Sequence, residues 1–299
     1  MNLFDRLMLE FYRVLNNAWR ESVRNAAYIA IQMLAELPPQ ERLNEMRVRK
    51  WMEVIEKHLG QDFAAAVNEP VKEYMRKSYH LGLQDVQRMG VKAGLKISIG
   101  LYGYENEQII AVVSENNVFW IKGVGEEAAQ PVQELLTKAF KEGWTKQDLA
   151  TALKEEFSDI ANNSDHYWLG LAEHMLLRIR EFGRLNGYKS AGATYYRLTN
   201  PMDDRTSEIC WALVGANKIY KLSNALEVME KVNDIDVGKI GLEEARARLK
   251  AIAPWINEKQ IVRDEYGQPI DVEGNHTPFP PFHWRCRTQT EMVFPDELK

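Results

Sequence analysis

Two blocks of sequence organise the C-terminal part of this chain. They read YYRLTNPMDDRTSEIC at residues 195–210 and PPFHWRCR at residues 280–287, and they contain the chain's two cysteines, Cys210 and Cys286. Each cysteine stands beside polar, turn-forming and aromatic residues. We therefore expect the two blocks to pack against each other, with Cys210 close to His283 and Cys286.

The charged residues of the blocks favour a structural role. Asp203 and Asp204 follow Pro201, which is typical of a turn and of the N-cap of a helix, here one starting near Thr206. The same aspartates with Glu208 also suggest a two-metal nuclease, but the local pattern favours capping. Arg205, Arg285 and Arg287 suit ion pairs with the aspartates or with backbone carbonyls. The expected structural staple consists of Asp203, Asp204, Arg205, Cys210, His283, Cys286 and Arg287.

The cysteines and the histidine leave three alternatives open. Cys210, His283 and Cys286 could supply three ligands to zinc, while the spacing does not specify a fourth, for which His276, Asp204 and Glu208 are candidates. The two cysteines could instead be small buried groups that behave as hydrophobes, and this alternative is favoured, so no cofactor is expected. Cys210 with His283 could also be the nucleophile and base of a hydrolase, although no oxyanion loop is evident.

The two blocks resemble the hallmark of the Mu F-like family of phage head morphogenesis proteins, the minor head proteins. That hallmark is an Asp-x-Arg-x-Cys-x-x-Cys block followed by a Pro-x-x-His-x-x-Cys-Arg block, and it matches residues 203–210 and 280–287. The resemblance spans residues 120–295. One position departs from it, because Ser207 stands where the family has its first cysteine, and serine is a poor zinc ligand.

The resemblance implies a virion structural protein of a tailed bacteriophage rather than an enzyme. Its expected partners are the portal protein, the major capsid protein and the phage genomic DNA, without a membrane. The expected location is the capsid interior or the portal vertex of the virion, and the host cytoplasm during assembly. The expected role is head morphogenesis, with DNA packaging or ejection. The alternatives are a Cys/His hydrolase or toxin-like enzyme and a zinc-dependent nucleic-acid-binding module.

Composition fits an ordinary soluble protein with one large or two ordinary domains. The chain has 299 residues, of which 45% are apolar and 27% charged. Neither a transmembrane run nor a secretory signal is expected, so two cysteines argue against a disulfide framework in a reducing cytoplasm. A net charge of -5 does not fit a dedicated nucleic-acid coat.

Hydrophobic periodicity predicts a mostly helical α+β protein with a small sheet. Residues 1–92 form an expected helical docking module, 93–122 a junction and 123–299 an α+β module. The helices are expected at residues 3–36 (stopped by Pro38-Pro39), 41–59 (ending at Gly60), 61–90 (interrupted at Glu69-Pro70), 125–142, 146–157 (capped by Thr145), 164–190, 223–231 (capped by Ser223) and 242–251. The strands are expected at residues 193–198, 218–222 and 287–293.

Two segments lack a clear period. In the junction, short apolar runs at residues 109–113 and 118–121 fit either strand or short helix. Residues 253–283 contain five prolines and are expected to form an extended loop, which needs an anchor in a compact domain. Deletion of residues 1–90 is expected to leave the C-terminal module folded.

Overall fold

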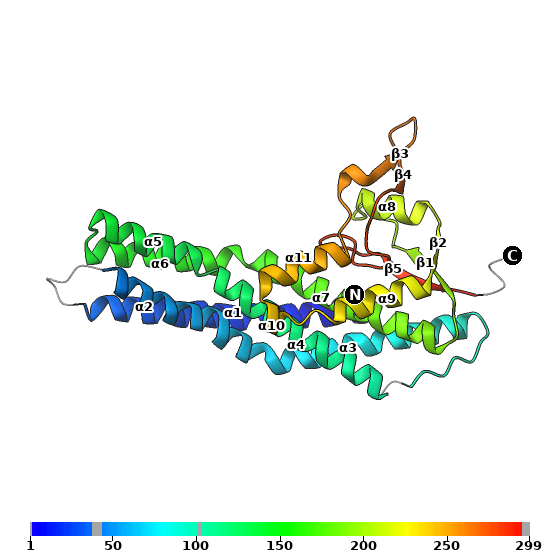
Figure 1. Ribbon diagram of the computed structural model, residues 1–299, viewed down its shortest axis with the longest axis horizontal. Coiled ribbons are helices and arrows are strands. Elements are labelled where there is room, and N and C mark those ends of the chain that lie inside the picture. Colours follow the sequence, from blue (N-terminus) through cyan, green and yellow to red (C-terminus); the bar gives the residue numbers. More distant parts are fainter. Residues whose placement is uncertain (1, 38–43, 101–102, 295–299) are drawn as a thin grey trace. The chain divides into compact units, whose positions relative to one another are not determined.

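The computed structural model describes residues 2–37, 44–100 and 103–294 and has the expected mostly helical α+β fold (Figure 1). The helices are α1 (Leu3–Ala35), α2 (Glu45–Glu56), α3 (Phe63–Lys92), α4 (Tyr104–Glu127), α5 (Gln130–Glu142), α6 (Lys146–Asn163), α7 (Asp165–Ser190), α8 (Glu208–Gly215), α9 (Leu222–Asn233), α10 (Val237–Ile240) and α11 (Leu242–Ile252). The strands are β1 (Tyr195–Thr199), β2 (Ile219–Lys221), β3 (Ile261–Arg263), β4 (Pro269–Val272) and β5 (Gln289–Val293). No helix in these ranges is long and apolar enough to cross a membrane.

The chain divides into two compact units. Unit 1 comprises Met1–Met8, Lys72–Asn116 and Gly170–Lys299, and unit 2 comprises Leu9–Val71 and Asn117–Leu169. These bounds differ from those of the predicted modules 1–92, 93–122 and 123–299. The difference arises because α1, α3, α4 and α7 are long helices that each contribute residues to both units.

Unit 2 contains a helix that continues where the sequence predicted an end. A π-helical turn, Lys57–Asp62, joins α2 to α3 without a break, so Gly60 does not end a helix. Gly60 lies against Gly125 of α4, where a Cβ atom on Gly125 would overlap the carbonyl oxygen of Leu59. The glycine therefore allows two helices to approach closely and does not act as a C-cap. Pro70 likewise lies inside α3 and does not interrupt it.

The core of unit 2 is built around three aromatic rings. Trp19 lies 5.2 Å from Phe63 and 5.2 Å from Trp168, measured between ring centroids, and Phe63 lies 5.0 Å from Trp168. All three side chains are buried. At the far end of α5, Gly143 adopts a left-handed conformation, and Thr145 caps α6, as predicted.

Helix α4 replaces most of the predicted junction. Residues 109–121 are continuous helix rather than strand or short helix. The reason is visible in the burial of Ile110, Val113 and Ile121, which recur at helical spacing on one face. The predicted stop at Pro38-Pro39 lies outside the described residues.

Unit 1 contains the sheet that positions the two blocks. Its order is β2-β1-β5, both pairings are antiparallel, and the register runs from Tyr195 opposite Val293 to Thr199 opposite Gln289. The three strands were predicted, since Tyr- and Thr-rich runs favour a pleated, half-buried surface. Alternate residues of β1, Tyr196 and Leu198, are buried.

The predicted extended loop at 253–283 contains a hairpin instead. Strands β3 and β4 pair antiparallel, with Ile261 opposite Val272, and the hairpin packs against α8 (Figure 1). Its turn is closed by Asp264, whose carboxylate accepts hydrogen bonds from two backbone N–H groups further along the turn. Helix α9 begins at Leu222, with Lys221 in the cap position, so Ser223 is not its N-cap.

Candidate functional site

The two blocks meet through the pairing of β1 with β5. Cys210 Sγ lies 3.0 Å from His283 Nε2 and 3.9 Å from Cys286 Sγ. One ligand atom from each of the three residues falls within 4.8 Å of the others. The structure thus confirms the predicted proximity of Cys210, His283 and Cys286, which form a Cys–His cluster.

The start of α8 sets the position of Cys210. Ser207 is the N-cap of this helix, and its Oγ accepts a hydrogen bond from the backbone N–H of Cys210 at 3.3 Å. The same Oγ lies 2.9 Å from His283 Nε2. The predicted aspartate N-cap is therefore wrong, and the helix begins at Glu208, two residues after the predicted start near Thr206. Asp203 instead accepts a hydrogen bond from the Arg205 N–H at 3.1 Å and shapes the turn before the helix.

Aromatic packing holds the second block in place, and a hydrogen bond anchors the loop that precedes it. The loop is anchored by a hydrogen bond from Tyr196 Oη to the Pro278 carbonyl at 2.6 Å. Trp284 lies against Gly170 of α7, where an added Cβ atom would sit 2.5 Å from the indole. His174 stacks on Trp284 at a centroid distance of 6.0 Å. A bulky side chain at position 170 would therefore displace this block.

Only part of the predicted ion-pair staple is present. Arg287 donates to both oxygens of Asp203, at 2.7 and 3.0 Å, and this guanidinium holds the pKa of Asp203 well below its usual range. Arg205 is exposed and stands 3.6 Å from Asp203. Within the described chain, neither Asp204 nor Arg285 forms a hydrogen bond or ion pair through its side chain, so neither the staple role predicted for Asp204 nor the ion pair predicted for Arg285 is seen. Asp204 is exposed in the turn before α8.

None of the proposed fourth zinc ligands reaches the Cys–His cluster. Glu208 pairs with Arg263 at 2.6 Å. The Nδ1 of His276 lies 2.7 Å from the carbonyl of the next residue. Asp204 belongs to no group of potential ligands among the residues described. The atom that does approach is the Ser207 hydroxyl, at the position where the family hallmark has a cysteine.

Protonation within the Cys–His cluster favours a charged pair. A hydrogen bond from the Cys286 thiol and the neighbouring His283 lower the pKa of Cys210 to about 4, against the opposing effect of burial. Burial and the adjacent Cys210 raise the pKa of Cys286 well above its ordinary value. Burial lowers the pKa of His283, but its hydrogen bond to Cys210 and the charge on Cys210 outweigh burial and leave it raised. These directions favour a negative charge on Cys210 and a proton on His283, with the Cys286 thiol as hydrogen-bond donor.

The separation of the two cysteine sulfurs also matches that of zinc ligands. Tetrahedral zinc with Zn–S bonds of about 2.3 Å places two sulfurs roughly 3.8 Å apart, and the observed separation is 3.9 Å. His283 Nδ1 lies 2.8 Å from the Trp284 carbonyl, which can only accept, so Nδ1 carries the proton and Nε2 faces the sulfurs. Backbone hydrogen bonds at Phe282 and Thr288 stabilise a charged Cys286 sulfur. Cys210, His283 and Cys286 would hold such a metal, and the Ser207 hydroxyl lies 2.9 Å from His283 Nε2.

A nucleophilic role for Cys210 fits the geometry less well. Its side chain is buried, 1% exposed, and that of Cys286 is 2% exposed. A cavity of about 540 Å³ adjoins the site and is lined by Cys286, Arg205 and Arg287, but neither Cys210 nor His283 lines it. A substrate in this cavity would thus meet the thiol with the raised pKa rather than the thiolate.

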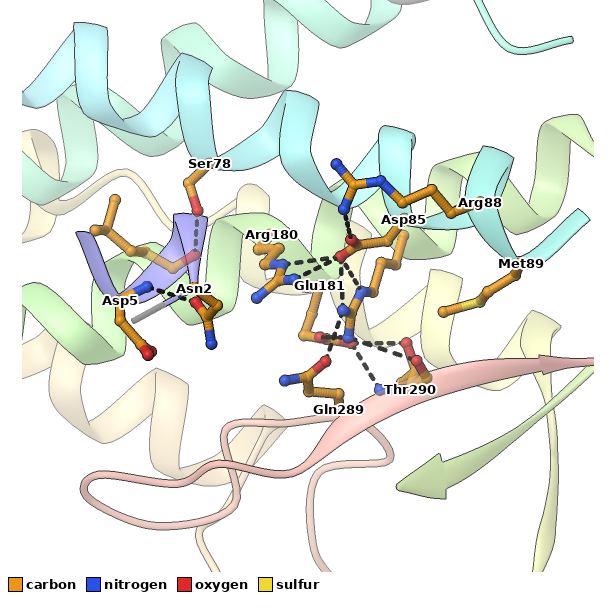
Figure 2. Close-up of polar contacts among 12 residues, drawn as sticks. Asn2, Asp5, Ser78, Asp85, Arg88, Met89, Arg180, Glu181, Gln289 and Thr290 are labelled. Carbon is orange, nitrogen blue, oxygen red and sulfur yellow. Dashed lines mark hydrogen bonds and ion pairs between the residues drawn. The ribbon is translucent and has the colours of Figure 1, made fainter. Parts of the chain in front are cut away.

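A buried charge network in contact with β5 was not predicted from the sequence (Figure 2). Asp85 Oδ2 of α3 accepts from Arg180 Nε at 2.9 Å and from Arg184 Nε and Nη2 at 2.9 and 2.6 Å. Arg184 also donates to Glu181 Oε1 at 2.7 Å. Glu181 Oε2 in turn accepts from the backbone N–H and the hydroxyl of Thr290, at 3.1 and 2.6 Å. The network therefore ties α3 and α7 to the strand that follows Cys286.

A signal for this network was present in the sequence. Glu181 and Arg184 interrupt the apolar stripe of α7, between Ile179, Phe182 and Leu185. Charged residues in such a stripe are buried only when they are paired. Their partner on α3 could not be read from the spacing, because it lies about a hundred residues away in the chain.

Neither family models, nor curated proteins, nor solved structures match this chain.

Proposed function

We propose that this chain is a minor head protein of a tailed bacteriophage, a virion structural protein that binds the portal or the inner capsid surface during head morphogenesis. The observation that carries the proposal is the convergence of the two resemblance blocks. Residues that match the family hallmark, among them Asp203, Cys210, His283, Cys286 and Arg287, form one contiguous site although about seventy residues separate the blocks. A chance match of two short patterns would have no reason to assemble in this way.

In this proposal the site is a structural staple. The β1–β5 pairing, the Asp203–Arg287 ion pair and the buried Cys–His cluster hold the long connection between the blocks against the sheet. A connection that is held against the sheet in this way suits a protein that must present a fixed surface in an assembled head. The portal protein and the major capsid protein are the proposed partners, and genomic DNA would be met during packaging or ejection.

Mass spectrometry of purified virions from the source phage tests the proposal. We expect the chain in mature particles at a few copies per head, and we expect it to co-elute with the portal protein when the two are co-expressed. Its absence from virions, together with failure to bind portal, would overturn the proposal. Hydrolytic activity that is lost in a normally folded Cys210→Ser protein would instead establish the enzyme alternative.

A zinc-dependent nucleic-acid-binding module is the second candidate, favoured by the Cys210–His283–Cys286 donor set. Elemental analysis of purified protein decides whether one zinc is retained. Ser207→Cys provides a sharper test, because Ser207 Oγ lies 2.9 Å from His283 Nε2 and a sulfur there would complete a Cys₃His set. If the site binds zinc, this variant should bind it more tightly than the parent chain, and Glu208→Ser, one residue away, should not. DNA binding that requires the metal would favour this candidate.

A further inference from the structure

The two sulfur atoms of the Cys–His cluster lie close enough to be joined by a bond. Cys210 Sγ and Cys286 Sγ are 3.9 Å apart, and both cysteines are free. A disulfide bond is about 2.05 Å long, so each sulfur would have to move by about 1 Å. Rotation about the two Cα–Cβ bonds supplies a movement of that size. The chain contains no other cysteine, so within one chain neither sulfur has a competing partner.

The backbone holds both cysteines in this position. Cys210 lies in the first turn of α8, where its N–H donates a hydrogen bond to the N-cap Ser207. Cys286 lies three residues before β5, which is paired with β1 and held by Glu181 through Thr290. Both elements are thus fixed beside the sulfurs, and bond formation needs rotation of side chains rather than rearrangement of the fold.

The two sulfurs do not belong to a complete metal site. Structural zinc sites use four protein ligands, whereas the group of potential ligands within the described chain has three members, Cys210, His283 and Cys286. The further polar atom beside His283 is the hydroxyl of Ser207, and serine is a poor zinc ligand. An incomplete ligand set leaves the two thiols open to oxidation.

Burial limits the reagents that can reach the pair. Cys210 is 1% exposed and Cys286 is 2% exposed, so a protein disulfide cannot approach either sulfur. Cys286 is among the residues that line the cavity of about 540 Å³ in unit 1, whereas Cys210 is not. A cavity of this volume admits a molecule as small as hydrogen peroxide. The suitable oxidant is therefore a small peroxide, and the expected product is a bond within one chain.

We propose that Cys210 and Cys286 form a redox couple that hydrogen peroxide closes to an intramolecular disulfide. The bond would join α8 to the loop before β5 and so lock the two blocks together covalently. For a head protein, and therefore on the basis of the function proposed above, the lock would close after particles leave the reducing cytoplasm of the host. During assembly the pair would stay reduced.

The chemistry needs only the Cys–His cluster and one molecule of hydrogen peroxide. The thiolate of the pair attacks one peroxide oxygen, the O–O bond breaks, and the departing hydroxide takes a proton from His283 to become water. The second thiol then attacks the sulfenic sulfur, the S–O bond breaks, and hydroxide leaves as water with the proton of that thiol. The two sulfurs together lose two electrons, and the peroxide gains them. His283 is placed for the proton transfer, because its Nε2 lies 3.0 Å from Cys210 Sγ.

Peptide mapping of the purified full chain before and after hydrogen peroxide tests the couple. We expect a cross-linked pair of peptides that contain Cys210 and Cys286, in monomeric protein, and we expect dithiothreitol to release it. The thermal midpoint should rise by about 5–10 °C on oxidation and return on reduction, because the bond would join residues 76 positions apart and so restrict the unfolded chain. Cys286→Ser, treated with the same peroxide, is the matched control for methionine oxidation and should show no rise.

Several results would overturn the proposal. One is a peroxide-treated chain in which iodoacetamide still alkylates both cysteines after unfolding. Others are a sulfinic acid on Cys286 as the sole cysteine product and a disulfide between two chains. A retained zinc ion that protects both sulfurs until a chelator removes it would overturn the couple in favour of the metal site.

Released particles opened in iodoacetamide test the timing of the lock. The cross-linked peptide in these particles supports closure after release, and alkylated Cys210 and Cys286 would refute it. Absence of the chain from particles would refute the head-protein proposal alone, because the cross-link in the purified chain does not depend on that proposal.

Discussion

Replacement of Asp85 by asparagine should destabilise unit 1 more than any single change at the protein surface. Asp85 is 7% exposed, and its carboxylate accepts hydrogen bonds from Arg180 and Arg184, with Arg88 at 3.3 Å as a third arginine. Asparagine keeps the size of the side chain but removes the charge. Arg184, 2% exposed, would then keep Glu181 as its only carboxylate partner within the described chain.

The expected loss follows from the burial of the guanidinium groups. Burial opposes the charge on Arg184, yet Glu181 and Asp85 together raise its pKa above the ordinary value, so the charged form depends on both carboxylates. Removing one partner of a buried ion pair costs about 3–5 kcal/mol. The lower end, about 3 kcal/mol, applies here because Glu181 remains and because the side chain of Arg180, 12% exposed, can regain some hydration.

Urea and thermal unfolding, followed by circular dichroism, measure this loss. For a unit of this size about 3 kcal/mol corresponds to a fall in midpoint of roughly 6–12 °C. Glu73→Gln is the matched control, because Glu73 is also on α3 and pairs with Lys77 at the surface, where a pair is worth about 0.5 kcal/mol or less. A loss for Asp85→Asn that does not exceed the loss for Glu73→Gln would refute the reasoning.

Four further predictions address other parts of the molecule. Cys210→Ser should lower the free energy of unfolding by about 1–3 kcal/mol, as expected for a perturbed buried site; an unchanged urea midpoint would contradict this. Burial and the charge of Arg178 lower the pKa of His174 well below its ordinary value, so unfolding allows this side chain to bind a proton once the pH falls below its unfolded pKa of about 6.5. The free energy of unfolding should therefore fall by up to about 1.4 kcal/mol per pH unit on the acid side, and His174→Phe should remove this dependence. Parallel stability–pH profiles of the two proteins would argue against it. Gly125→Ala should cost about 2 kcal/mol or more through overlap with a neighbouring backbone carbonyl, whereas Gly215→Ala, with open space around it, should not; equal melting temperatures would rule out the close approach. Deletion of residues 1–90 should leave the remainder of unit 1 unfolded, contrary to the sequence-based expectation, since it removes the α3 side of the charge network; a fragment with sharp near-ultraviolet circular dichroism would restore that expectation.

The meeting of the two blocks could be predicted because its signals are local. Two cysteines in polar, aromatic surroundings, strand-forming runs at Tyr195–Thr199 and Gln289–Val293, and a proline-rich connection are all visible in the chain. Each of these features restricts the local backbone conformation, and together they leave few arrangements of the two blocks in a compact domain. The resulting proximity of Cys210 to His283 is what the structure contains.

The elements that were missed depend on contacts between distant segments. Apolar runs as short as those in residues 109–121 are equally compatible with strand and helix, and only burial against neighbouring helices identifies α4. The hairpin of β3 and β4 lies among prolines and turn residues that mask its short apolar runs, and its packing on α8 stabilises it. Gly60 has the appearance of a helix end, but it is required by the close approach of Gly125.

The charge network and the Cys–His cluster are physically linked through β5. Thr290 is held by Glu181, and Gln289 accepts a hydrogen bond from Arg184 at 2.7 Å, so the first two residues of the strand are fixed from the side of α7. Cys286 precedes this strand by only three residues, which leaves its sulfur little freedom once the strand is fixed. The geometry that brings the second block to Cys210 is therefore maintained in part by buried charges outside both blocks. A change at Asp85 should consequently disturb the Cys–His cluster as well as the stability of the helices, although it touches neither cysteine.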